Sequence, residues 1–138
     1  MGINVNVATP KGYEPQSDVV DVAAGYAEDS GAVISVSHNP HKAVEKADII
    51  YTDTWVSMGQ EAETKHRLHD FKNFQINNEL VRLADPDFIF MHCLPAHRGQ
   101  EVTEEVIDGG HSIVFDQAEN RLHIQKAILL ELLKTHSS

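Results

Sequence analysis

The only cysteine of the chain, Cys93, stands where an apolar stretch ends. Residues 88–91 are all apolar, His92 precedes the cysteine, and Leu94 and Pro95 follow it. A thiol in this position could be a small core residue, a metal ligand, a nucleophile or a polar group in a binding site. The residue types alone leave these four possibilities open.

Three other polar residues that could do chemistry also follow apolar stretches. Asp53 and Ser57 come after one stretch, and Arg121 comes after another. A carboxylate is a strong acceptor for an ammonium group, and a guanidinium binds an oxygen that carries negative charge. Structural explanations exist as well, because Ser57 with Gln60 is a helix capping box. Asp53 fits a turn and Arg121 a solvated helix face, but Trp55 in the same polar loop needs a packing surface.

Covalent or metal-dependent chemistry has little support in the sequence. A nucleophilic Cys93 needs a positioned base, and the adjacent His92 points to the opposite face if both lie on a strand. The chain has nine histidines, but no HExxH or CxxC motif and no acidic partner completes a set of metal ligands. We therefore expect no metal and no organic cofactor, and the sequence has no glycine-rich loop for a nucleotide.

Composition limits the class of protein. A chain of 138 residues, 41% hydrophobic and 23% charged, can form one domain with a core and is too short for two. Its formal charge of −10 disfavours nucleic acid and acidic membranes as partners. A single cysteine cannot form an internal disulfide, and no signal peptide or membrane-spanning run is present. We expect a cytoplasmic protein.

Secondary structure is predicted to alternate between strands and helices. Short apolar stretches predict strands over 3–8, 32–36, 48–52, 88–93 and 112–115. Helical patterns occupy 18–29, 41–47, 60–71, 77–84 and 120–134, and the tail 135–138 is expected to fray. This order predicts an α/β fold, with an open parallel sheet flanked by helices in three layers. The carboxyl ends of its strands lie at one edge, so Asp53, Ser57, Cys93 and Arg121 are expected to face one cavity.

Four segments resemble the ornithine carbamoyltransferase family. They are ATPKGYEP (8–15), DTWVSMGQ (53–60), HCLPAHRG (92–99) and AENRLH (118–123). The resemblance covers essentially the whole chain, and implies that 1–138 is a single, partial ornithine-binding domain with a Rossmann-like sheet. Such enzymes transfer a carbamoyl group from carbamoyl phosphate to the δ-amine of L-ornithine, giving citrulline and phosphate. They use no metal or organic cofactor and typically form trimers.

The resemblance also implies roles for single residues. Asp53 and Ser57 would hold the α-amino group of ornithine, and the Met58 backbone would help to fix its α-carboxylate. These roles suit the chemistry, because a carboxylate accepts from an ammonium and helix-start amides favour an anion. Cys93 would lie beside the attacking δ-amine and assist its deprotonation without bonding covalently.

The resemblance also implies which parts of the chain recognise the carbamoyl group. The turn formed by His92, Cys93 and Leu94 would present backbone carbonyls to the carbamoyl NH₂ group, which has two donors and no charge. Arg121 would contact the carbamoyl oxygen, where negative charge develops in the transition state.

The chain also departs from the family pattern. It contains neither the carbamoyl-phosphate lobe, with its Ser-Thr-Arg-Thr-Arg and His-Pro-x-Gln motifs, nor the first strand of the ornithine lobe. Strands 3–8 and 48–52 would then lose their common neighbour, so we expect them to close on one another or another chain to fill the gap. We expect self-association and no catalysis by the chain alone. The alternative is a stand-alone, non-catalytic domain for amino-acid binding or oligomerisation.

Overall fold

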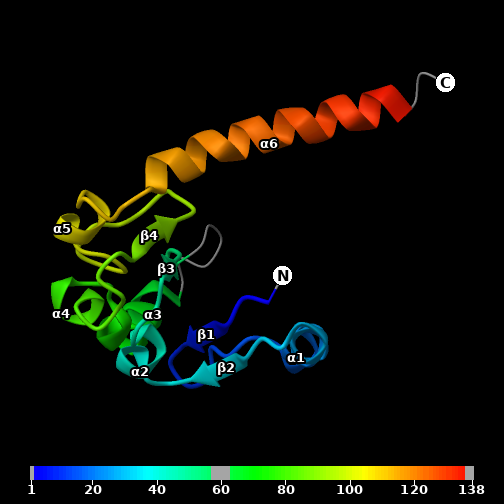
Figure 1. Cartoon of the computed structure of the whole chain (residues 1–138). Coiled ribbons are helices and arrows are strands. Elements are labelled where there is room, and N and C mark those ends of the chain that lie inside the picture. The colour runs from blue at the N-terminus through cyan, green and yellow to red at the C-terminus, as the bar shows by residue number, and fades with distance from the viewer. Residues whose placement is uncertain (1, 57–62, 136–138) are drawn as a thin grey trace.

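A computed structural model of the chain describes residues 2–56 and 63–135. Strands and helices alternate along it, as Figure 1 shows. The elements are β1 (Val5–Ala8), α1 (Ser17–Ser30), β2 (Ile34–Ser37), α2 (Pro40–Val44), β3 (Ile49–Thr52), α3 (Thr64–Asp70), the 3₁₀ helix η2 (Lys72–Phe74), α4 (Asn78–Val81), β4 (Ile89–His92), α5 (Glu104–Ile107) and α6 (Val114–Thr135).

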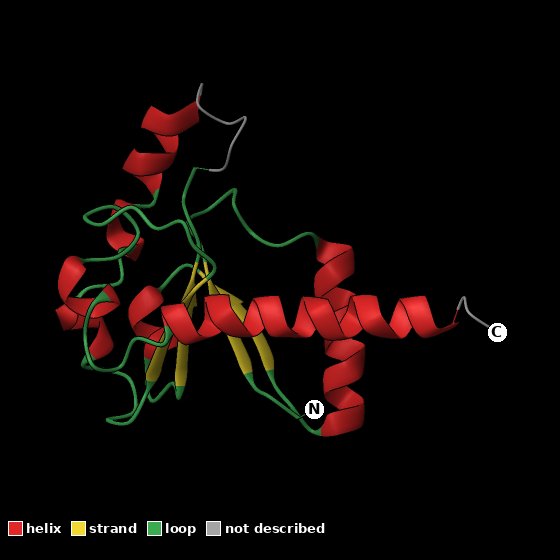
Figure 2. Ribbon diagram, turned by 90° about the horizontal axis from the view of Figure 1, so that it is seen from above, coloured by secondary structure: helices red, strands yellow, loops and turns green. Residues whose placement is uncertain are grey.

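The four described strands run parallel, in two separate pairs. β1 pairs with β2, and β3 pairs with β4 with Thr52 opposite His92. Figure 2 shows the two pairs side by side. The α/β class, with parallel strands flanked by helices, is confirmed. Because β1 and β3 do not pair, the described strands form two sheets where we expected one, and the expected direct closure does not occur.

The predicted fifth strand is wrong. Residues 112–115 form only an isolated bridge between Ser112 and Phe90 of β4. The backbone N–H of Phe90 donates to the carbonyl of His111, and its carbonyl accepts from Ile113 N–H. The chain then turns at once into α6, six residues before the predicted helix start. The residues 136–138 of the predicted frayed tail lie outside the described part of the chain.

The buried core belongs to the β3–β4 pair. Phe90 of β4 is fully buried and Ile50 of β3 nearly so. Helices α2 and α4 close the core, and each begins at an asparagine, Asn39 or Asn77, whose side chain accepts N–H groups of the first turn. The core cluster comprises Val44, Ile50, Ile76, Leu80, Phe88, Phe90, Val102, Val106, Ile107 and Val114.

The β1–α1–β2 unit is much less buried. Helix α1 ends at Gly31, whose left-handed φ of 73° allows its N–H to bond the Ala27 carbonyl. Its apolar side chains are not covered, because Tyr26 is 72% exposed and Val22 59%, and only Ala27 is buried. The 14-residue helix is roughly 21 Å long, whereas the four-residue strands beside it span roughly 13 Å. The pair is too small to cover the helix.

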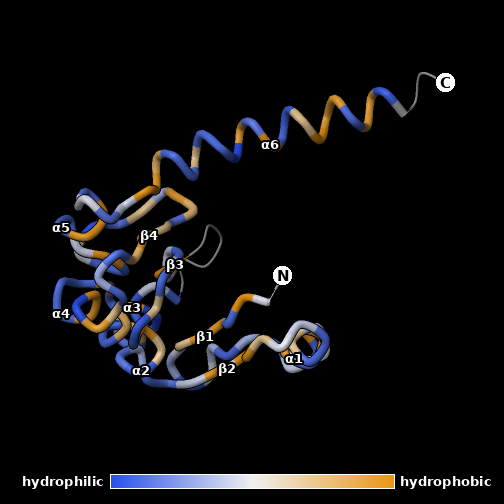
Figure 3. Tube along the Cα trace, viewed as in Figure 1, coloured by the Kyte–Doolittle hydropathy of each residue, from blue (hydrophilic) through white to orange (hydrophobic). Residues whose placement is uncertain are grey.

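Helix α6 projects away from the rest of the chain (Figure 1). From Ala118 to Lys134 every residue is exposed. Its sequence mixes apolar with polar residues along the whole length, as the hydropathy colouring in Figure 3 shows. Large apolar side chains on it that are at least half exposed include Leu122, Ile124, Ile128, Leu129 and Leu130.

Candidate active site

The ends of β3 and β4 bring two of the predicted residues into contact. The strand register places Thr52 opposite His92, so the residues that follow, Asp53 and Cys93, leave the pair side by side. The Cys93 thiol donates to Asp53 Oδ1 at 2.8 Å. The same oxygen accepts the backbone N–H of Thr54 at 2.7 Å, which fixes the carboxylate at the strand end. This contact confirms that the two strand ends share an edge.

The thiol of Cys93 is held in its neutral form. Burial raises its pKa first, and the hydrogen bond to Asp53 and the negative charge of that carboxylate raise it further. A reactive cysteine needs the opposite environment, with nearby positive charge that stabilises the thiolate. Tyr51 of β3, whose own pKa is raised by burial and by the neighbouring thiol group, adds no such charge. The site therefore gives Cys93 the properties of a weak donor and not of a nucleophile.

Glu101 is a site residue that the sequence did not suggest. It is fully buried, and its Oε1 accepts the backbone N–H of His97 and lies 3.4 Å from Nε2 of the fully buried His92. The geometry of this close approach does not make a hydrogen bond. The other ring nitrogen of His92, Nδ1, accepts the backbone N–H of Leu94 at 2.9 Å. A neutral His92 ring thus carries its proton on the side of Glu101.

The turn after Cys93 has an unusual backbone. Leu94 has a φ of 54°, in the left-handed region that residues other than glycine rarely adopt, and the peptide bond to Pro95 is cis. The bond from Leu94 N–H to the His92 ring holds this left-handed residue in place. The buried His92 ring therefore supports the turn, while the Cys93 thiol contacts Asp53.

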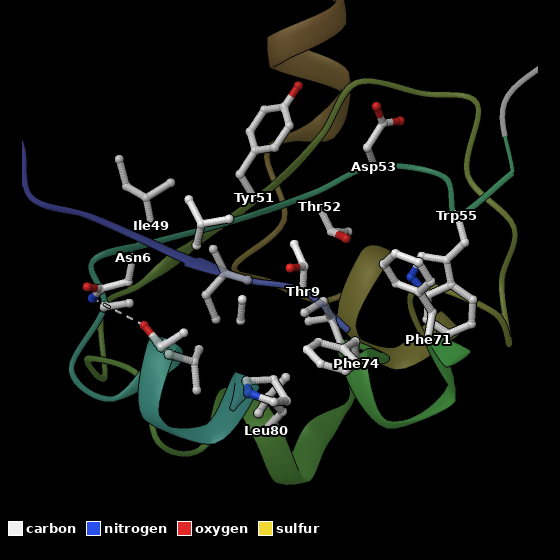
Figure 4. Close-up of a pocket in the computed structure, with 18 of the residues that line it drawn as sticks. Asn6, Thr9, Ile49, Tyr51, Thr52, Asp53, Trp55, Phe71, Phe74 and Leu80 are labelled. Carbon is white, nitrogen blue, oxygen red and sulfur yellow. Dashed lines mark hydrogen bonds between the residues drawn. The ribbon is translucent and has the colours of Figure 1, made fainter. Parts of the chain in front are cut away.

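Gln117 of α6 ties the helix to both strands. Its Oε1 accepts the backbone N–H of His92 at 3.0 Å, and its Nε2 lies 3.5 Å from the hydroxyl of Tyr51. It takes the place that a fifth strand would have occupied beside the end of β4. One turn further on, Arg121 lines a cavity of about 450 Å³ together with Gln117, Tyr51 and Cys93. The structure thus brings Cys93 and Arg121 to one cavity, but Asp53 lines a different cavity of about 430 Å³ between β1 and β3 (Figure 4), so the expectation of one shared cavity is wrong for Asp53.

Trp55 has a structural explanation. Its ring is 8% exposed and packs against Phe71, with ring centroids 5.7 Å apart. Arg67 approaches the Trp55 carbonyl at 3.4 Å and lies over the ring of Tyr13, which itself meets Phe71 edge-on. This aromatic group anchors the loop after Asp53 to helix α3.

The remaining expectations concern residues or groups that the structure covers only in part. Ser57 and Met58, predicted to bind ornithine, lie outside the described residues. Across residues 2–56 and 63–135, no three His, Cys, Asp or Glu side chains are grouped so that they could hold a metal ion. Over the same ranges, no helix combines the length and the apolar character needed to cross a membrane.

Comparison with known proteins identifies the family of the chain. The model of the family described as aspartate/ornithine carbamoyltransferase, Asp/Orn binding domain, matches residues 1–132. The chain belongs to this family. It is 59% identical over 129 residues to the ornithine carbamoyltransferase of Thermococcus kodakarensis, a match that covers 94% of the chain and 41% of that relative.

Solved structures of the carbamoyltransferase family have the same fold. The ornithine carbamoyltransferase of Pyrococcus furiosus superimposes with a TM-score of 0.87 at 58% identity, over 93% of this chain and 41% of that one. The anabolic enzyme of Campylobacter jejuni gives 0.90 at 38% identity, over 97% and 44%. The chain therefore spans about two fifths of the length of the relatives it matches.

Proposed function

We propose that this chain is the ornithine-binding part of an ornithine carbamoyltransferase. The reaction transfers a carbamoyl group from carbamoyl phosphate to the δ-amine of L-ornithine, giving L-citrulline and phosphate. The observation that carries the proposal is the contact between Asp53 and Cys93 at paired strand ends, beside the cavity lined by Arg121. The single cysteine suits a reducing compartment, which supports a cytoplasmic location.

Asp53 is the residue that recognises the amino acid. A carboxylate offers about four acceptor positions, and Asp53 Oδ1 uses two of them on Cys93 and Thr54. The carboxylate keeps capacity for the α-ammonium group of ornithine, a charge-assisted interaction stronger than one between neutral groups. Ser57 and the Met58 backbone complete this part of the proposed site.

Cys93 and Arg121 act on the reacting groups. The neutral Cys93 thiol lies beside the δ-amine and relays a proton: its sulfur accepts a proton from the amine as the thiol proton passes to Asp53 Oδ1. The free amine then attacks the carbamoyl carbon, and phosphate leaves. Backbone carbonyls of His92, Cys93 and Leu94 accept the NH₂ group of carbamoyl phosphate. Arg121 donates to the carbamoyl oxygen as that oxygen gains negative charge in the transition state. Stabilisation of such a developing charge is usually the largest single contribution to the rate.

The proposal assigns this chain only one part of the machinery. Phosphate binding needs clustered arginine donors, and the motifs that the family uses for them are not in this sequence. Incubated alone with carbamoyl phosphate and ornithine, the 138-residue chain is expected to form no citrulline above a no-protein control. Turnover by this chain alone would contradict the division of roles.

A chimera tests the function itself. The part of the Pyrococcus furiosus enzyme that matches this chain is replaced by residues 1–138, and citrulline formation is measured. We expect activity, and an Arg121→Ala change should reduce kcat by about 10²–10³-fold, the usual loss for one donor to a developing oxyanion. The exposed Arg82→Ala change at the end of α4 is the matched control and should leave kcat unchanged.

Two outcomes would contradict the chimera proposal. One is a folded chimera with no activity, and the other is equal loss in the Arg121 and Arg82 variants.

A Cys93→Ser change should lower kcat without abolishing it, and mass spectrometry during turnover should find no carbamoyl adduct on Cys93. A trapped adduct would assign the thiol the nucleophilic role.

The exposed apolar residues of α6 favour a second role in self-association. Leu122, Ile124, Ile128 and Leu129 are each at least half exposed on a helix that projects from the core. We propose that copies of the chain associate through this helix, as the trimers of the family would require. Sedimentation velocity should show assemblies that an Ile124→Lys, Ile128→Lys variant converts to monomers. Monomers of the unaltered chain at high concentration would exclude this role.

A further inference from the structure

Glu101 is a buried acidic residue to which the proposed reaction assigns no role. Its side chain is fully buried, and acidic side chains are almost never fully buried unless they are paired. Burial removes the hydration of a carboxylate, and this is costly unless other groups compensate for the loss. The contacts of the carboxylate must therefore explain why Glu101 lies where it does.

The carboxylate of Glu101 contacts both ends of the segment 92–97. Its Oε1 accepts the backbone N–H of His97 and lies 3.4 Å from Nε2 of His92. The same oxygen lies 3.7 Å from Nδ1 of the His97 ring, which is half exposed. One buried oxygen thus lies between His92, where β4 ends, and His97, at the far end of the turn.

The backbone around Glu101 is fixed by residues outside this segment. The Glu101 carbonyl accepts the N–H of Ile76 at 2.9 Å, and the next residue, Val102, forms an isolated bridge with Ile76. Both Ile76 and Val102 belong to the buried core. The Gln75 side chain also donates to the carbonyl of Gln100 at 2.8 Å. Glu101 therefore connects the turn after β4 to the packed core.

His92 transmits this support to Leu94. A carboxylate beside Nε2 favours the tautomer that carries its proton there. Nδ1 is then free to accept the backbone N–H of Leu94 at 2.9 Å. Leu94 has a left-handed φ of 54°, a conformation that persists only where the surrounding structure supports it.

We propose that Glu101 is a positioning residue for the carbamoyl group. Through the His92 ring and the His97 N–H, it holds the turn whose carbonyls accept the carbamoyl NH₂ group. This inference rests on the proposed function, which assigns that contact to the backbone of residues 92–94. It also makes Glu101 a determinant of specificity, because a site that accepts from NH₂ disfavours an acetyl group, whose methyl has no donor.

Two phosphate compounds test the proposal in the chimera with the Pyrococcus furiosus enzyme. Carbamoyl phosphate is the substrate, and acetyl phosphate, with a methyl in place of NH₂, is the competitive inhibitor. Glu101→Asp removes one methylene, so the carboxylate no longer reaches both ends of the turn. We expect KM for carbamoyl phosphate to rise about tenfold through weaker hydrogen bonds to its NH₂ group. KM for ornithine and the inhibition constant of acetyl phosphate should not change.

Two further variants serve as controls. Glu101→Gln keeps the length and an oxygen that can accept the His97 N–H, so it should keep KM for carbamoyl phosphate within about threefold of the unaltered value. Glu104→Asp is the same change as Glu101→Asp at an exposed position of α5, and it should alter no constant.

Two kinetic results would overturn the proposal. If Glu101→Asp weakens carbamoyl phosphate and acetyl phosphate equally, the residue does not act on the NH₂ group. If it lowers kcat and leaves all binding constants unchanged, it only reduces the fraction of folded enzyme. Absence of activity in the chimera with unaltered Glu101 would instead contradict the proposed function, and the link between Glu101 and the turn is then decided by NMR.

NMR of the isotope-labelled 138-residue chain tests that link without any substitution. The nitrogen signals of the His92 ring report directly which nitrogen carries the proton. We expect a proton on Nε2, beside Glu101, and none on Nδ1, which accepts from Leu94. A proton on Nδ1 would break the connection from Glu101 to Leu94 and overturn the proposal, even if the Glu101→Asp variant does not fold.

Discussion

β1–β2 and β3–β4 are both pairs of four-residue parallel strands, but only the second pair contains buried residues, although Ile49 and Tyr51 of β3 are exposed. The outer edge of β4 is bonded to residues 111–113, and helices α2 and α4 bury Ile50 and Phe90. In the first pair and its helix, Val5, Val22 and Tyr26 remain exposed. Equal backbone pairing therefore does not give equal stability, because apolar burial supplies most of the stabilising free energy.

The candidate site lies on the enclosed pair. Asp53 and Cys93 follow directly from β3 and β4, and Glu101 is buried beside them. A site must hold its groups within a fraction of an ångström, and residues anchored to a packed core can do this. Residues 6–9 of the open pair and residues 49–52 of β3 line a separate cavity of about 430 Å³ (Figure 4). Four changes test this contrast, from the largest expected effect to the smallest.

Replacing Phe90 by alanine should have the largest effect. The ring is fully buried in the β3–β4 core, so the change leaves a cavity and should lower the free energy of unfolding by about 3–5 kcal/mol. Urea denaturation followed by tryptophan fluorescence measures it, since the only tryptophan, Trp55, lies on the same half. If the unfolding free energy fell only as much as it does for replacement of an exposed valine, the β3–β4 pair would not be the more stabilising of the two pairs.

Removing the Glu101 carboxylate should have the next largest effect. Glu101→Ala leaves the N–H of His97 without its acceptor and removes the carboxylate that lies beside the buried His92 Nε2, which should cost about 1–3 kcal/mol of unfolding free energy. The proton NMR signals of the turn at Leu94 should shift as well, because His92 holds it. Replacing the exposed Glu79 by alanine is the matched control and should change neither quantity.

Asp53→Asn should increase the reactivity of Cys93. Loss of the carboxylate charge lowers the raised pKa of the thiol, so more thiolate is present at pH 8. Iodoacetamide should alkylate Cys93 faster, by about tenfold for each unit by which the pKa falls. In the unaltered chain the raised pKa also means that the environment of Cys93 stabilises the fold below the ordinary thiol pKa, and that this contribution is lost as pH rises. Unchanged alkylation in the variant would contradict the assigned role of Asp53.

Val19→Ser on α1 should have almost no effect. The Val19 side chain is more than half exposed in the open half of the molecule, so its loss changes the unfolding free energy by less than about 0.5 kcal/mol. A loss of several kcal/mol would mean that α1 is covered in solution, which the assembly of several copies could explain.

The sequence predicts that Asp53 and Cys93 lie at the same edge of the sheet, but neither their hydrogen bond nor its surroundings. Parallel strands place their carboxyl ends together, and this rule needs only the strand positions. Glu101 could not be found in this way, because an acidic residue in a polar segment resembles a solvated one until the fold buries it. The run 112–115 has the same apolar pattern as a strand, and only its position at the start of α6 decides that it forms a bridge. Gln117 directly follows this run, so its contacts with β3 and β4 could not be predicted from a strand at 112–115.

Helix α6 also bears on how secondary structure in this chain responds to temperature. Its 22 residues form a rod of roughly 33 Å, and beyond Gln117 every residue through Lys134 is exposed. A helix without a covering surface is governed by the helix–coil equilibrium, with a costly nucleus and gradual melting from its end. Ellipticity of the dilute chain at 222 nm should therefore decline steadily on heating before the core unfolds. Higher protein concentration should suppress that early decline if copies assemble along the helix.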